Sequence, residues 1–114
     1  MIDYGPILVA TLKNILPTYH ELTITRGTKT PCISYQEANN YATDTGDTIG
    51  YSRLAYQIKI WGTDIGELNK YACQIDATLR PLGWKLVSTG ELYDRNSTMI
   101  QKILRFEARA YETF

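Results

Sequence analysis

The feature that most constrains this chain is a change of hydrophobic period near its middle. From Tyr51 to Trp61 apolar and polar residues alternate, the period of two that a strand with one buried face requires. The apolar residues that follow recur at steps of three and four, as on one face of a helix: Ile65, Leu68, Ala72, Ile75 and Leu79. Thr63 or Asp64 is suited to cap this helix, and Pro81 and Gly83 to end it. The segment therefore predicts a half-buried strand followed directly by an amphipathic helix.

The remaining segments add one helix and three strands. Apolar residues at helical spacing, ending at Pro17, predict a first helix over about residues 4–16. A polar stretch over 18–30 reads as a loop, with a short strand considered at 22–25. Strand-like runs are Cys32–Ala38, Trp84–Tyr93 and Met99–Tyr111. The order α-β-β-α-β-β favours an α+β fold, with two helices on one face of a mostly antiparallel four-stranded sheet. At 114 residues we expect a single domain over 1–114.

Residues 39–50, between two of the predicted strands, are mostly turn formers and predict a long loop. Asp44 and Asp47 could be oxygen ligands, but the closing Glu and the alternating acidic positions of a calcium loop are missing. We therefore expect no metal site here, and a loop that orders against a partner with Tyr41 as an aromatic anchor. The candidate contact residues of this loop are Tyr41, Thr43, Asp44, Thr45 and Asp47.

Basic residues occupy outward positions of the two best strands. They are Arg53, Lys59, Arg105 and Arg109, accompanied by the acidic Glu107. If the two strands are neighbours, one face of the sheet is locally basic. Three interpretations stay open: a solvated sheet face, a polar interface between subunits, or a surface near passing DNA.

The sequence contains no catalytic, phosphate-binding or metal-binding motif that we can recognise. Two cysteines, Cys32 and Cys73, and one histidine, His20, are too few for a Cys/His zinc site, so we expect buried thiols and an ordinary surface histidine. Twelve basic and twelve acidic residues give no net charge, which argues against a dedicated nucleic-acid binder. We expect no enzyme activity, no cofactor and no membrane association, and a protein made and used, or packaged, inside a cell.

The order of segments resembles the tail-terminator family of long-tailed bacteriophages over nearly the whole chain. An initial helix ends at Asn14-Ile15-Leu16-Pro17, and a strand led by proline follows at Pro31–Tyr35. After a variable hairpin loop, the strand Leu54–Trp61 runs straight into a helix at Thr63-Asp64. Two strands form the C-terminal part of the chain, and the last of them contains Ile103–Ala108.

This resemblance implies a structural protein of the virion's tail–neck region, assembled in the host cytoplasm. It implies a hexameric ring that caps the tail tube, stops its polymerisation and presents the surface on which the head connector docks. Its partners would be other copies of itself, the tail tube protein and a head-completion or connector protein, with DNA only in transit through the lumen. Another neck protein, either a head-completion or a connector-adaptor subunit, is the alternative. A small-molecule binding module is a more distant one.

Overall fold

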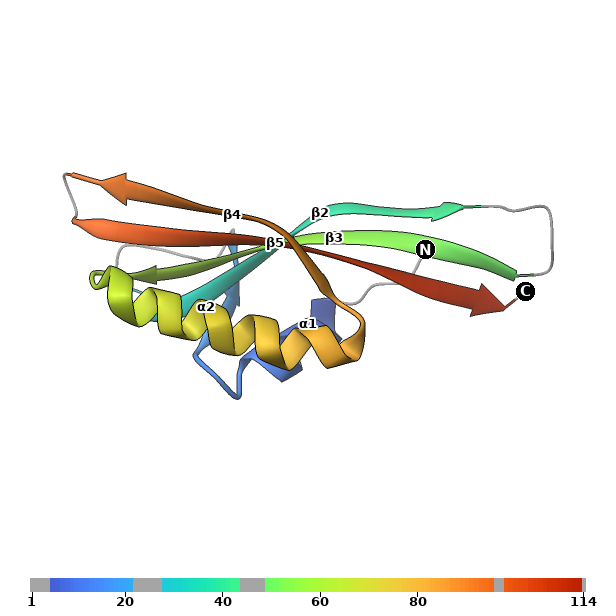
Figure 1. Ribbon diagram of the computed structural model, residues 1–114, viewed down its shortest axis with the longest axis horizontal. Helices are drawn as coiled ribbons and strands as arrows, with labels where there is room; N and C mark the ends of the chain where they lie inside the picture. The colour runs from blue at the N-terminus through green and yellow to red at the C-terminus, as the bar shows by residue number, and fades with distance from the viewer. Residues whose placement is uncertain (1–4, 22–27, 44–48, 96–97, 114) are drawn as a thin grey trace.

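The computed structural model describes residues 5–21, 28–43, 49–95 and 98–113, without the side chains of residues 5, 38–43, 49–54 and 109–113. Within these residues, two helices and a short 3-10 turn accompany one five-stranded sheet (Figure 1). The elements are α1 (Gly5–Leu12), β1 (Thr18–His20), β2 (Cys32–Thr43), β3 (Ile49–Gly62), α2 (Ile65–Leu79), η2 (Arg80–Leu82), β4 (Lys85–Asp94) and β5 (Met99–Thr113).

The sheet has the strand order β1-β2-β3-β5-β4. The pairings β2–β3, β3–β5 and β5–β4 are all antiparallel, as predicted for the four expected strands. The prediction of four strands was incomplete, because β1 adds a fifth, parallel to β2 over only three residue pairs. Three residues carry too little periodicity to stand out in a sequence, whereas the neighbouring β2 supplies the partner that orders them.

Both helices lie on one face of the sheet, as predicted (Figure 1). The core lies between them and the even-numbered positions of β3 and β5, where Tyr56, Ile58, Ile60, Leu104 and Phe106 are each at most 1% exposed. The helices contribute the buried residues Leu8 and Leu12 from α1, and Leu68, Ala72, Ile75 and Leu79 from α2. All these residues form one cluster, so the helices and the sheet share a single core.

Both ends of α2 match the sequence prediction. Asp64 is the N-cap, and its carboxylate accepts a 2.9 Å hydrogen bond from the main-chain nitrogen of Gly66. Beyond η2, Gly83 has φ of 95°, a left-handed conformation that glycine adopts at little cost. The chain then returns to the sheet through Trp84, whose ring packs edge-on against Tyr56 with ring centres 5.7 Å apart.

Three predicted boundaries require correction. Helix α1 ends at Leu12 rather than near residue 16, and residues 13–15 form turns instead. The long loop over 39–50 was wrong at both ends, because β2 continues to Thr43 and β3 begins at Ile49. Pairing with β3 and β5 supplies the backbone hydrogen bonds that these turn-forming residues would otherwise lack. The possible strand at 22–25 lies outside the described residues.

Candidate interaction surface

The sheet face opposite the helices, which we call the open face, carries most of the candidate contact positions. Pairing between β3 and β5 runs without a register shift from Ile49–Thr113 to Gly62–Ile100. Positions two apart in such a ladder share a face, so the odd-numbered positions of both strands lie on the open face. Lys59 and Arg105 belong to it, as do positions 53 and 109. The sequence-based condition that the two strands be neighbours is therefore met.

The register also fixes how close the basic positions are. Arg53 and Arg109 are direct Cα partners, and Tyr41 on β2 is the Cα partner of Arg53. Arg105 is opposite Gln57, and Lys59 is opposite Ile103. The sheet thus brings together residues that lie up to 68 positions apart in the chain (Tyr41 to Arg109). Thr43 is the last residue of β2, whereas Asp44, Thr45 and Asp47 lie outside the described residues.

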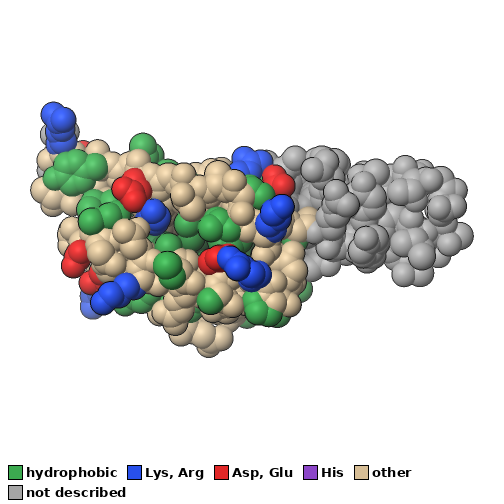
Figure 2. Space-filling model, in the orientation of Figure 1, with side chains coloured by type: hydrophobic (Ala, Val, Ile, Leu, Met, Phe, Trp, Pro, Cys, Tyr) green, Lys and Arg blue, Asp and Glu red, His purple; other side chains and the backbone are tan. Residues whose placement is uncertain are grey.

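Acidic partners offset the positive charge where side chains are described. Lys59 forms an ion pair with Glu21, and both side chains are largely buried. Arg105 lies 3.8 Å from a Glu107 oxygen, with both side chains 43% exposed, an exposure at which such a pair contributes little stability. On the different aspect of the molecule that carries α2, Figure 2 also shows basic and acidic side chains side by side. This part of the open face is therefore charge-balanced rather than basic.

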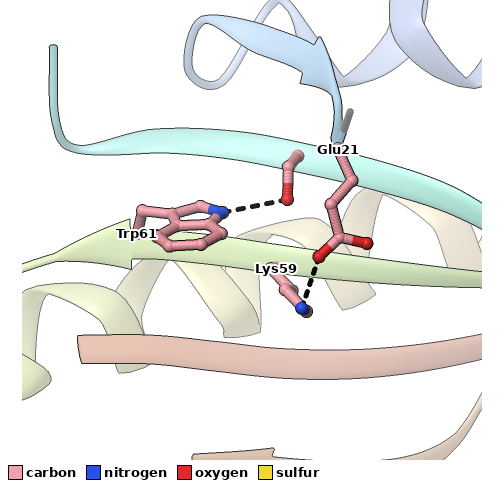
Figure 3. Close-up of polar contacts among 4 residues, drawn as sticks. Glu21, Lys59 and Trp61 are labelled. Carbon is pink, nitrogen blue, oxygen red and sulfur yellow. Dashed lines mark hydrogen bonds and ion pairs between the residues drawn. The ribbon is translucent and has the colours of Figure 1, made fainter. Parts of the chain in front are cut away.

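A small polar cluster covers the open face where β2 begins (Figure 3). The indole nitrogen of Trp61 donates a 2.9 Å hydrogen bond to Ser34 Oγ, and Lys59 Nζ lies 5.9 Å from the centre of the Trp61 ring. Glu21, just after β1, reaches across β2 to Lys59. Ser34 is consequently only 1% exposed although it faces away from the helices. These contacts tie β1, β2 and β3 together.

The molecule is elongated, with extents of 52 × 25 × 22 Å. Its long dimension comes from β2, β3 and β5, which continue together past the helices (Figure 1). We call this three-stranded extension the arm, comprising residues 38–43, 49–54 and 109–113. Tyr41, Arg53 and Arg109 therefore occupy the arm. Arg53 and Arg109 lie in strands as predicted, whereas Tyr41 lies in a paired strand rather than in the loop expected from the sequence.

Strand β4 forms an exposed edge of the sheet, which was not predicted from the sequence. Strand β4 is the last strand of the sheet, and nearly all its residues are exposed. Val87, Leu92 and Tyr93 are 41%, 55% and 59% exposed, an unusual concentration of apolar surface on one strand. The signal available in the sequence was weak alternation over 84–93, which fits a strand that buries little on either face.

The cysteines and the histidine differ in part from expectation. Cys32 is buried as predicted, and burial raises the pKa of its thiol. Cys73 is exposed on α2, so the prediction of two buried thiols was wrong for it. His20 is half-buried in β1, with its ring edge-on to Tyr35 at 5.3 Å, rather than an ordinary surface residue.

The described part of the chain contains neither a metal-binding group of side chains nor a membrane-spanning helix. No group of three His, Cys, Asp or Glu side chains there is placed to hold a metal ion. No helix among the same residues is long and apolar enough to cross a membrane.

Comparisons with known proteins show a likeness at the level of the fold. No protein-family model and no curated protein sequence matches the chain. Among solved structures, a chain in the virion of a native gene transfer agent particle superposes with a TM-score of 0.61. The match covers 93% of this chain and 85% of that chain, with 16% sequence identity. At that identity, the shared property is the fold.

Proposed function

We propose that this protein is a structural component of a phage-like virion, and specifically a tail terminator. Six copies form a ring on the finished tail tube, end its polymerisation and present the surface to which the head connector docks. The observation that carries the proposal is that nearly the entire fold is shared with a chain of a virion particle. The segment order, which resembles the tail-terminator family, supports the finer assignment independently of that likeness.

The surfaces of the molecule suit an assembly subunit. A closed ring needs two different patches on each copy, because each contact is heterologous. The exposed edge of β4 and the arm lie on different parts of the sheet and provide two such patches. The absence of net charge removes a general repulsion between copies. We propose a non-enzymatic role, since such a ring acts through stable contacts.

The same proposal places the protein in the tail–neck region of the virion after assembly in the host cytoplasm. Its partners are further copies, the tail tube protein and a head-completion or connector protein, and DNA passes through the lumen. Charge balance on the described part of the open face suits a protein contact better than a DNA-binding surface, which needs an excess of basic side chains.

The test is the symmetry of the assembled particle. Native mass spectrometry and mass photometry over a wide concentration range, followed by negative-stain class averages, should show six copies in a ring, either alone or after addition of purified tail tubes. A ring of twelve would indicate a connector-side neck protein instead. A protein that stays monomeric at all concentrations and does not bind tube ends would refute the proposal.

A further inference from the structure

Strand β4 has an outer edge with no other described strand beside it. Among the residues that the structure describes, its strand neighbour is β5 alone. Natural proteins usually protect such an edge with charge, proline or a very short strand, because its free N–H and C=O groups pair readily with another chain. Strand β4 is ten residues long, contains no proline and is uncharged from Leu86 to Gly90. Its protective features are the bulge between Leu86 and Ser88 and the charged residues Lys85, Glu91 and Asp94, which leave the stretch between them unprotected.

A second open edge lies on the opposite side of the sheet. Strand β1 covers β2 only from Ile33 to Tyr35. From Ala38 to Thr43, the described strands give β2 a single strand neighbour, β3. This segment, Ala-Asn-Asn-Tyr-Ala-Thr, contains no charged residue and no proline. Like residues 86–90 of β4, this segment has neither a charged residue nor a proline to prevent pairing with another strand.

The strand directions make these two edges compatible. Direction alternates from β2 through β3 and β5 to β4, so β2 and β4 run in opposite directions. When a second copy is placed beside the first in the same orientation, its β2 becomes antiparallel to β4. We propose that β4 of one copy pairs with Ala38–Thr43 of β2 in the next copy, continuing the sheet across the subunit boundary.

The pairing requires the copies to be displaced along the strands. Residues that are paired across successive strands form a row perpendicular to the strands. Gly90 lies in the row of Lys59, and Tyr41 lies in the row of Arg53, which is six residues away along β3. Pairing Gly90 with Asn39, in the row of Ala55, needs a displacement of four. Both displacements, six and four residues, are even numbers. Because side chains alternate between the two faces of a sheet, an even displacement keeps the helices of both copies on the same face. At about 3.3 Å per residue the displacement is roughly 13–20 Å.

A repeated displacement of this kind is the stagger that tilted strands have in a closed barrel. The closure of the array rests on the ring proposed above, but the pairing of two copies does not. The exposed Leu92 lies on the open face in the row of Gln101 and Trp61, so a neighbouring strand would also cover part of its apolar surface.

Cysteine cross-linking tests which edges meet. In a Cys73→Ser background, one preparation carries Gly90→Cys and another carries Tyr41→Cys. A Cβ at Gly90 has no neighbour within 4 Å, so the first substitution has room. After mixing and treatment with a bis-maleimide spanning about 8 Å, which is the reach of directly opposite and diagonal cross-strand pairs, covalent dimers should form about tenfold faster than in either preparation alone. The control mixes Tyr41→Cys with wild-type protein, whose exposed Cys73 lies on α2, away from the β4 edge, and should give few covalent dimers.

A substitution at the edge gives a second measurement. Leu92→Lys should weaken self-association at least about tenfold, equivalent to about 1.4 kcal/mol, while the equally exposed Leu82→Lys on η2 should leave it unchanged. Equal association of the two variants overturns the proposal, and so does dimerisation of Gly90→Cys with itself. A sixfold ring without the mixed cross-link refutes this pairing and spares the proposed function. A mixed cross-link in open chains that form no rings supports this pairing and refutes the proposed function.

Discussion

Gly62, the last residue of β3, provides a sharp test of how closely α2 is packed on the sheet. A Cβ built on Gly62 would lie 2.8 Å from Cδ2 of Leu68, well inside ordinary van der Waals contact. Leu68 is 1% exposed and belongs to the core cluster, so its side chain cannot move without displacing other buried residues. Gly62→Ala must therefore shift Leu68 or α2, and overpacking of this kind costs about 1–3 kcal/mol.

The matched control is Gly90→Ala, also a glycine within a strand, where the added Cβ meets nothing within 4 Å. Reduced freedom of the unfolded chain should stabilise this variant by about 0.4–1 kcal/mol. The same effect offsets part of the strain in Gly62→Ala and leaves a net loss of about 1–2 kcal/mol. At about 2.1 cal/mol/K per residue, 114 residues correspond to roughly 4 °C per kcal/mol.

We expect Gly62→Ala to lower Tm by about 4–8 °C and Gly90→Ala to leave it equal or slightly raised. Urea titration and thermal melting followed by circular dichroism give both values. All variants are compared at one protein concentration, because self-association makes Tm depend on concentration. If Gly62→Ala proved as stable as Gly90→Ala, the close approach of α2 to the end of β3 would be refuted.

Asp64→Ala should lower the free energy of unfolding by about 1 kcal/mol in denaturant titrations, since it removes the N-cap hydrogen bond, while Asp64→Asn retains most of it. Trp61→Phe should cost about 1–3 kcal/mol because it leaves the buried Ser34 hydroxyl without its indole donor; adding Ser34→Ala should recover part of the loss, and no recovery would argue against that bond. A chromogenic disulfide reagent at pH 8 should titrate only Cys73 in the folded protein and both thiols in denaturant. Cys32 is buried and its raised pKa keeps it protonated, so two fast-reacting thiols in the folded state would contradict the structure.

The candidate surface shows where sequence reasoning reached its limit. The alternation in β3 and β5 correctly assigned Lys59 and Arg105 to the face away from the helices. It could not supply Glu21 as the partner of Lys59, because that contact depends on β1 docking beside β2. The exposed edge of β4 was equally out of reach, since an edge is a property of strand order and not of one strand's pattern.

The sequence by itself determined the elements with strong periodicity: the one-sided strand β3, the amphipathic α2 with its cap at Asp64, and the alternating β5. Each has a buried face whose period is set by its own residues. Tertiary structure decided the rest. Tyr41 and Thr43 belong to a strand only because β3 runs beside them and satisfies their backbone hydrogen bonds, and the local pattern of turn-forming side chains does not indicate this pairing.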